Sequence, residues 1–301
     1  MALTRQRAIT YFVLCSLGII VLIVAVYALL FHTRVGTAVI PRATTSTSVV
    51  FMDVGQGDAT LITDGKTQML VDCGISDIIL SALGRNMPYF DRTIEYLVVS
   101  HADADHFGGC ASVLRSYDVE RVYYNGLAED GKDPKWTAFA AAVREEGLEL
   151  EPVDRLIGWE IGGAQVETLF PNFAITRSWR ATPTSKAITD NNASVVIRVS
   201  VNGVGRVLIL GDAEVEQEAY LAATYTRGEL MVDVLRTGHH GSKTSSTDVL
   251  LRAVGARTAI ISSGKENRYG HPHERVLSRL ERYGMHVRRT DIEGDITTVL
   301  Y

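Results

Sequence analysis

Cysteine is scarce in this sequence, and runs of like charge, low-complexity stretches and internal repeats are absent. Three cysteines in 301 residues exclude a small protein built on a disulfide framework. Hydrophobic residues make up 46% of the chain and charged residues 22%, so a packed core can form and disorder of the whole chain is excluded. A chain of 301 residues accommodates one large domain or two small ones.

Acidic residues are missing from the first 47 positions, which hold four arginines. The other 26 basic residues stand against 35 acidic ones in the rest of the chain, which gives that part a net charge of −9. A globally acidic domain is a poor general binder of polyanions. Any contact with nucleic acid must therefore be local or depend on metal ions.

Charge of either sign is missing between Ala8 and Phe31, a stretch of 24 residues. A helix of that length, rising about 1.5 Å per residue, spans the roughly 30 Å hydrocarbon layer of a membrane. The core of a signal peptide is shorter, at about 7–15 residues, and a charge-free helix of this length is unusual in a protein core. We therefore expect residues 1–31 to form a short basic tail and a transmembrane anchor, and residues 32–47 to form a linker.

The arginines favour one orientation of this anchor only modestly, because two precede it and two follow it. Together with the terminal amine, they favour an amino terminus inside the cell. The sequence therefore predicts a single-pass protein of the cell membrane whose large domain is extracytoplasmic.

Beyond the linker, residues 48–301 are predicted to form one domain of about 250 residues. Glycines and the Asp64-Gly65 pair between the first three apolar segments predict hairpins. The predicted strands are Val49–Val54, Ala59–Ile62, Thr67–Asp72, Tyr96–Ser100, Gln165–Leu169, Ser194–Val201, Arg206–Leu210, Val232–Leu235 and Thr258–Ser262. Helical spacing is present in Ala111–Tyr117, Trp136–Glu146, Ala213–Tyr225, Thr247–Val254 and Pro272–Tyr283. This order favours an α/β fold with two sheets and helices packed outside them.

Six of the eight histidines gather in three short segments, and the most informative is HADADH at residues 101–106. This segment follows the buried strand Tyr96–Ser100 and precedes two glycines and a helix. In extended backbone, His101, Asp103 and Asp105 point the same way, and His106 joins them where the helix starts. Four such ligands can surround two metal ions, whereas a solvated acidic loop would not explain the flanking histidines.

The pattern His-x-Asp-x-Asp-His resembles the His-x-His-x-Asp-His signature of metallo-β-lactamase-fold hydrolases. Together with FMDVGQGD at residues 51–58, it is similar to the hydrolase domain of ComEC-type competence proteins. The resemblance runs from about Ser48 to Tyr301. It implies a metallo-β-lactamase-like αββα sandwich that holds two divalent metal ions, here preceded by one transmembrane helix.

Further site residues follow from the resemblance by position. Asp72 matches a carboxylate that hydrogen-bonds the histidine loop, although a turn-forming strand end is the plain alternative. Asp212 matches the carboxylate that bridges the metals, with a helix N-cap as its alternative. Of the pair His239-His240, we expect His240 to bind metal and His239 to lie in the substrate pocket.

The loop at Tyr269–His273 is placed at the site by the same resemblance. His271 is expected to protonate a leaving group or hold a phosphoryl oxygen, unless it merely precedes a helix that starts at Pro272. His273 is expected on the helix surface. No role is assigned to His286 or His32.

A third histidine of the family pattern is missing, because no histidine lies between His106 and His239. Asn191 and Asn192 stand at the corresponding place. The first metal site would then have His101, Asp103 and Asp212, with an asparagine carbonyl as a further candidate, which favours harder ions such as Mn²⁺. The second site has Asp105, His106, Asp212 and His240 and suits Zn²⁺.

Two adjacent cations explain why no serine or cysteine nucleophile is needed. A hydroxide held between them is available near neutral pH and would attack phosphorus or a carbonyl carbon, with Asp105 and His271 at the reacting centre. Ser242 is expected to be a hydrogen-bonding or capping residue.

The substrate is suggested by a polar loop between Pro171 and Thr189 that carries Arg177, Trp179 and Arg180 and no acidic residue. Basic and aromatic side chains can grip a phosphodiester and stack on a base, which favours a nuclease-like activity, including one on single-stranded DNA. An ordinary surface loop, a cell-envelope phosphoester substrate and a non-catalytic binding module remain alternatives. A role in DNA uptake would require separate channel proteins, and the oligomeric state stays open.

Cys73 and Cys110 each lie next to one of two motifs. In the family fold, these two motifs meet at one site. In an exported domain, that proximity allows a disulfide. The alternative is a pair of small buried thiols.

Overall fold

The computed structural model describes residues 46–127, 133–181 and 185–301, which belong to one compact unit. The predicted anchor and nearly all of the predicted linker lie outside the described residues. Among the residues that are described, no helix is long and apolar enough to cross a membrane. The first strand begins at Thr47.

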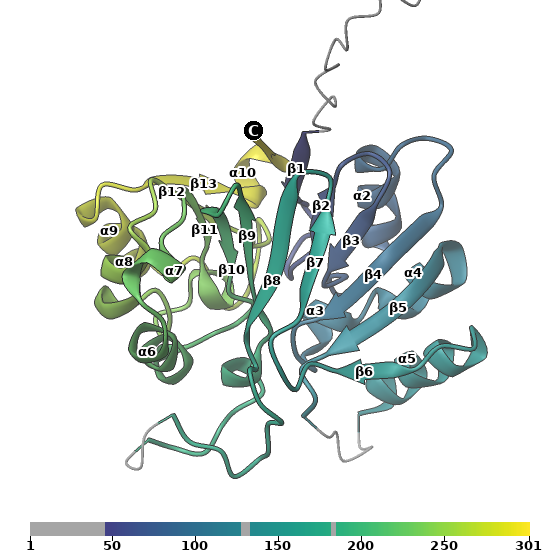
Figure 1. The fold of residues 1–301 in the computed structure, drawn as a ribbon, viewed down its shortest axis with the longest axis horizontal. Coiled ribbons are helices and arrows are strands. Elements are labelled where there is room, and N and C mark those ends of the chain that lie inside the picture. Colours follow the sequence, from purple (N-terminus) through teal and green to yellow (C-terminus); the bar gives the residue numbers. More distant parts are fainter. Residues whose placement is uncertain (1–45, 128–132, 182–184) are drawn as a thin grey trace, which may run out of the picture. The chain divides into compact units, whose positions relative to one another are not determined.

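Two seven-stranded sheets lie face to face between two layers of helices (Figure 1). The first sheet has the order β14-β1-β2-β3-β4-β5-β6. Its strands are β1 (Thr47–Phe51), β2 (Thr60–Thr63), β3 (Gln68–Val71), β4 (Thr93–Val99), β5 (Asp118–Tyr124), β6 (Leu150–Pro152) and β14 (Ile296–Leu300). The helices α2 (Ile78–Asn86), α4 (Cys110–Ser116) and α5 (Pro134–Glu145) cover its outer face.

The second sheet has the order β13-β12-β11-β10-β9-β8-β7. Its strands are β7 (Gly158–Ile161), β8 (Ala164–Phe170), β9 (Val196–Val201), β10 (Val204–Ile209), β11 (Val234–Arg236), β12 (Thr258–Ile261) and β13 (His286–Arg289). The helices on its outer side are α6 (Val215–Thr224), α7 (Arg227–Leu230), α8 (Asp248–Val254) and α9 (Glu274–Arg282). The predicted αββα arrangement of sheets and helices is therefore confirmed.

Three apolar clusters hold these layers together. The middle cluster combines side chains of both sheets, such as Phe51 and Val98 from the first and Ile197 and Val207 from the second. The other two clusters lie between each sheet and its own helices. Both faces of each sheet are therefore buried, which explains the continuous apolar runs that the sequence shows at the central strands.

The hairpins predicted from glycine and Asp64-Gly65 are confirmed, since β1 pairs with β2 and β2 with β3 in antiparallel register. The prediction that the last helix starts at Pro272 is wrong. It begins at Glu274, because the ring nitrogen Nδ1 of His273 accepts a hydrogen bond from the backbone N–H of Arg275 and so caps the first turn. His273 is therefore a capping residue rather than a residue of the helix surface.

The carboxyl ends of four strands, two from each sheet, meet at one edge of the sandwich. β3, β4 and β5 run parallel in the first sheet, and β10, β11 and β12 run parallel in the second. Loops that follow β3, β4, β10 and β11 carry Asp72, His101, Asp212 and His240 respectively. Because parallel strands end at the same edge, residues far apart in sequence come together there.

Candidate metal centre

The HADADH segment turns directly from β4 into the short helix α3 (Ala104–Phe107). Asp103 is the last residue before this helix, and its extended backbone allows His101 and Asp103 to face the same space. His106 lies inside the helical turn and is completely buried. The predicted change from extended to helical backbone is therefore present, and it begins two residues before His106.

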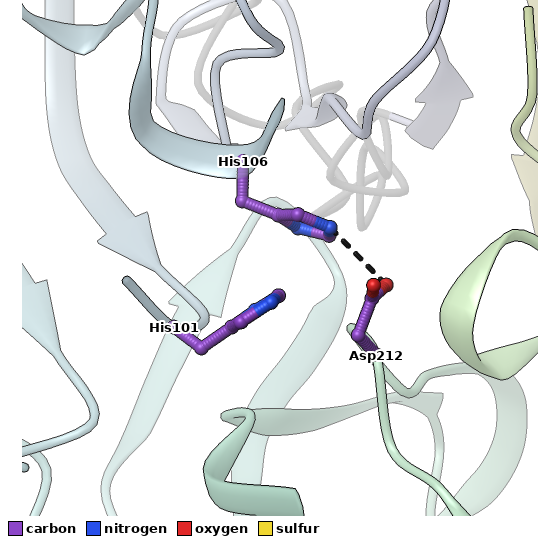
Figure 2. Close-up of side chains that lie close together, drawn as sticks. All are labelled: His101, His106 and Asp212. Atoms are coloured by element: carbon purple, nitrogen blue, oxygen red, sulfur yellow. Dashed lines mark ion pairs between the residues drawn. The ribbon is translucent and has the colours of Figure 1, made fainter. Parts of the chain in front are cut away.

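Asp212 lies at the middle of a cluster of histidines and aspartates (Figure 2). Its Oδ1 is 3.1 Å from Nε2 of His106, and its Oδ2 is 3.5 Å from Nε2 of His240. Nε2 of His240 is also 3.2 Å from Oδ2 of Asp105. His101 points at the same centre, and its Nε2 is 3.5 Å from Oδ2 of Asp103. All six residues predicted as metal ligands are thus brought together.

Asp72 fixes the orientation of His106 from behind. Nδ1 of His106 is 2.7 Å from Oδ2 of Asp72, so the Nδ1–H group donates a hydrogen bond to this carboxylate and Nε2 faces the centre. The same carboxylate accepts hydrogen bonds from the backbone N–H and the hydroxyl of Ser100, both at 2.7 Å. Asp72 therefore lies behind the histidine loop, where the resemblance placed it, and its backbone is left-handed with φ of 61°.

The rings of His240 and His101 are held in the same manner. Nδ1 of His240 is 3.0 Å from the carbonyl oxygen of Ser262. Nδ1 of His101 lies 3.0 Å from Oγ of Ser100 and 3.3 Å from Oγ of Ser194. In each of the three histidines, Nδ1 contacts another group of the protein and Nε2 points to the centre. This is the arrangement found around metal-binding histidines.

Several polar atoms at the centre are buried without a hydrogen-bond partner. They are Nε2 of His101, His106 and His240 and Oδ1 of Asp212. Buried polar atoms normally have partners, because leaving one without costs free energy. Histidine nitrogens and carboxylate oxygens that converge in this way fit divalent metal ions, so the residues present suit the ions that the motif implies.

Without metal, the histidines and aspartates of the cluster stabilise each other's charged forms. Burial opposes the charged form of His106, but the carboxylates of Asp212 and Asp72 outweigh burial and raise its pKa well above the usual value. Burial likewise opposes ionised Asp212, and the charges of His240 and His106 hold its pKa well below the usual value. The pKa of Asp105 is also lowered, since His240 and His106 outweigh its burial. The carboxylates are therefore ionised and ready to bind cations at neutral pH.

A family model, described as the metallo-beta-lactamase superfamily, matches residues 52–265, a range that contains the whole cluster. The chain belongs to the metallo-beta-lactamase superfamily. Two relatives support a closer assignment. ComE operon protein 3 of Bacillus subtilis (strain 168) is 32% identical over 275 residues, which cover 85% of this chain and 33% of that protein. Recombination protein 2 of Haemophilus influenzae is 34% identical over 249 residues, which cover 81% of this chain and 28% of that protein.

The predicted resemblance to the ComEC-type hydrolase domain is therefore confirmed. The chain spans a third or less of the length of these two relatives. A solved structure, the metallo-beta-lactamase fold protein YhfI from Bacillus subtilis, covers 84% of this chain and 99% of its own, with a TM-score of 0.51 and 11% identity. It shares the superfamily fold.

His239 and His271 lie beside the cluster of predicted metal ligands. Nδ1 of His239 is 3.1 Å from Oε1 of Glu214 and 3.2 Å from Nδ2 of Asn191, and its Nε2 is 3.7 Å from Oδ2 of Asp212. The rings of His239 and His271 have centroids 5.4 Å apart. Burial, together with the charges of His240 and His239, lowers the pKa of His271 to about 4, so this ring is neutral at pH 7.

Glu214 and the buried pair Arg236 and Asp58 are site residues that sequence reasoning missed. The signals were present, since Glu214 follows Asp212 by two positions, Arg236 is a charge at the end of the apolar strand VDVLR, and Asp58 closes the motif FMDVGQGD. The Arg236 guanidinium donates to the carbonyl oxygens of Gly211 and Thr237 at 2.5 and 2.6 Å. It thereby supports the backbone on both sides of the bridging carboxylate.

Other predicted site residues have partners away from the centre. Asn192 is buried, and its side chain accepts hydrogen bonds from the backbone N–H groups of Glu214 and Gln217, so it caps the start of α6 rather than facing substrate. The hydroxyl of Ser242 is 2.9 Å from that of Thr244. Ser242 also follows the turn Gly238–Gly241 as its C-cap residue, which agrees with the capping role expected for it.

In the polar loop before Asn191, the side chains predicted to contact substrate have partners within the chain. Trp179 packs against Phe170, Phe173 and Tyr220, with ring centroids 5.3–5.6 Å apart. Its ring is therefore engaged in an aromatic cluster over the second sheet and is not a free surface for stacking on a base. Arg177 forms an ion pair with Asp190, and Arg180 donates to the carbonyl oxygen of Ser185.

Proposed function

We propose that this protein is a membrane-anchored, metal-dependent hydrolase that cleaves phosphodiesters. The observation that carries the proposal is the common orientation of His101, His106 and His240, whose Nδ1 atoms are occupied by the protein and whose Nε2 atoms converge on Asp212. His101, Asp103 and Asp212 would hold one divalent ion. Asp105, His106, Asp212 and His240 would hold a second, and Zn²⁺ and Mn²⁺ are the candidates.

Bound divalent ions supply a water nucleophile at neutral pH and positive charge where the transition state becomes negative. The chain's own residues supply orientation. Glu214 and Asn191 hold the His239 ring over the centre, and the neutral ring of His271 offers a hydrogen bond to a phosphoryl oxygen. Asp72 and Ser262 keep His106 and His240 in the tautomer that leaves Nε2 free.

DNA is the substrate that we favour within this class. Support comes from the names of the relatives, since one is a recombination protein and another, from Neisseria gonorrhoeae, is a competence protein. For any role in DNA uptake, we propose separate channel proteins as partners. The loop around Trp179 gives little support, since its aromatic ring and its two arginines already have partners.

The anchor at residues 8–31 places this activity at a membrane. The Cys73–Cys110 disulfide is present in the structure, which confirms that pairing. Disulfides persist in oxidising compartments, so the bond supports an extracytoplasmic domain.

The test is an assay of the protein stripped of metal and reloaded with Mn²⁺ or Zn²⁺, with single-stranded DNA and bis-p-nitrophenyl phosphate as substrates. Asp105→Ala combined with His106→Ala removes two ligands, and His286→Ala is the matched control because His286 is an exposed residue of β13. We expect metal-dependent cleavage that the double variant loses and the control retains.

Each other result has a definite meaning. Cleavage of the small diester without cleavage of DNA would replace the nuclease assignment with another phosphoester, such as one of the cell envelope. Stoichiometric metal binding with no hydrolysis of either substrate would contradict the phosphodiesterase proposal. Failure to bind metal would leave a tethered, non-catalytic binding module.

A further inference from the structure

Two neighbouring aromatic side chains project into solvent from the link between α2 and β4. Tyr89 is 89% exposed and Phe90 is 93% exposed, which makes them the most exposed large hydrophobic residues in the described part of the chain. Their rings contact each other edge to face, with centroids 4.9 Å apart. Scattered apolar residues are ordinary on protein surfaces, but two adjacent aromatic rings that are both almost fully exposed indicate a surface with a partner.

This link lies at the edge of the first sheet where the chain enters the domain. β1 is antiparallel to β2, β2 is antiparallel to β3, and β3 is parallel to β4, so β1 and β4 start at the same edge. Ser46, the first described residue, lines the same surface hollow as Met87 and Pro88. The exposed aromatic pair is therefore next to the point at which the chain arrives from the predicted anchor.

The metal centre lies at the opposite edge. Its loops follow the carboxyl ends of β4, β10 and β11, whereas Tyr89 and Phe90 precede the start of β4 (Figure 1). The seven residues of β4 separate the two ends by about 23 Å at about 3.3 Å per residue.

We propose that the Tyr89–Phe90 loop enters the interfacial layer of a lipid bilayer and turns the metal centre away from the membrane. The inference rests on the proposed anchor at residues 8–31. The 14 residues from 32 to 45 reach at most about 50 Å, so the entry edge stays within reach of the membrane. Aromatic rings are favoured at the interface between lipid and water.

This orientation has a consequence for the substrate. A centre that faces away from the lipid is open to a polymer arriving from the aqueous side. It does not reach a phosphoester held in the headgroup layer of the same membrane. The proposal therefore favours DNA over a membrane-bound phosphoester.

The test uses the full chain in phosphatidylcholine vesicles, with and without bromine on the acyl chains. Phe90→Trp adds an indole at the loop, and the three native tryptophans at 136, 159 and 179 give the background that the unsubstituted protein measures. Leu156→Trp is the matched control. Leu156 is 55% exposed and follows β6, which ends at the metal-centre edge because β4, β5 and β6 run parallel.

We expect the added indole of Phe90→Trp to emit at shorter wavelength in vesicles and to lose emission when the lipid is brominated. The indole of Leu156→Trp should show neither change. If the chain floats with the vesicles and Phe90→Trp is quenched no more than Leu156→Trp, the inference is wrong and the anchor stands. If the chain does not float with the vesicles, the anchor proposal fails and the inference fails with it, while the hydrolase proposal is unaffected.

Discussion

Arg236 and Asp58 form an ion pair in the interior of the domain, with Nη2 of Arg236 2.6 Å from Oδ2 of Asp58 and both side chains buried. The backbone N–H of Asp58 also donates to the carbonyl oxygen of Asp105, at 3.1 Å. Arg236 donates to the carbonyl oxygens of Gly211 and Thr237. The pair therefore connects the histidine loop of the first sheet to the Asp212 loop of the second.

Asp58→Asn should be costly, because the buried Arg236 guanidinium loses its partner at 2.6 Å and keeps only the more distant carboxylate of Asp212, at 3.8 Å. We expect Asp58→Asn to lower the free energy of unfolding by about 3–5 kcal/mol. Combining it with Arg236→Met should cost less than the sum of the two single changes, since no charge is then left unpaired. Urea denaturation measures both values, and additive losses would contradict the coupling. Glu151→Gln, which breaks the exposed Arg121 pair, is the control and should cost at most about 1 kcal/mol.

Asp72→Asn should weaken metal binding. Asp72 accepts the hydrogen bonds from Ser100 and from Nδ1 of His106 on two different oxygens, and an asparagine amide has only one oxygen. The His106 ring therefore loses its fixed tautomer. Loss of such a supporting contact lowers metal affinity by about 10–100-fold. Calorimetric titration of the metal-free protein with Zn²⁺ measures the change. Asp118→Asn, at an exposed position of β5, should leave the affinity unchanged, and equal affinities for all three proteins would refute the role of Asp72.

The disulfide predicts the number of reactive thiols. Of the three cysteines, only Cys15 is outside the Cys73–Cys110 bond, so unreduced, denatured protein should show one reactive thiol and reduced protein three. Reduction should lower the free energy of unfolding by about 2–4 kcal/mol, because the bond closes a chain segment with a sequence separation of 37. Three thiols before reduction would show that the bond does not form.

Glu218 should make the stability fall as pH rises. The side chain is completely buried, and burial raises its pKa to about 7 although backbone N–H groups of Thr247 and Ser246 stabilise the carboxylate. A folded pKa above the unfolded value of about 4.5 means that its contribution to stability is complete below pH 4.5 and is lost as pH rises through about 7. Between pH 5 and pH 8, the unmodified protein should therefore lose stability relative to Glu218→Gln in urea titrations. A difference that does not change with pH would contradict this.

Gly57→Ala should disturb the histidine loop. The backbone of Gly57 has φ of +137°, and an added Cβ would lie 2.3 Å from the carbonyl oxygen of Asp105. Gly55→Ala is the matched control, since Gly55 has φ of +75° and no atom within 4 Å of the added carbon. Strain alone costs the control about 1–2 kcal/mol, and we expect Gly57→Ala to lose more stability and also metal affinity. Equal losses in the two variants would show that the close approach to Asp105 has no effect.

The sequence predicted the central strands better than it predicted the edges of the sheets. β4, β9 and β10 are rich in valine, isoleucine and leucine, so their composition identifies them. β5 alternates charged and apolar residues and β14 is mostly threonine and valine, and both were missed. The pairing of β14 with β1 joins the two ends of the domain, and no local pattern in either segment indicates it.

By itself, the sequence determined the local chemistry of this protein: an apolar strand followed by alternating histidine and aspartate, and two cysteines beside the motifs. These features depend on residue type and on spacing over a few positions. The tertiary structure alone decided that Arg236 reaches Asp58, that Glu214 holds His239, and that Trp179 packs inside an aromatic cluster. Such contacts join segments that are distant in the chain, and they depend on the packing of the two sheets and their helices, which no short stretch of sequence specifies.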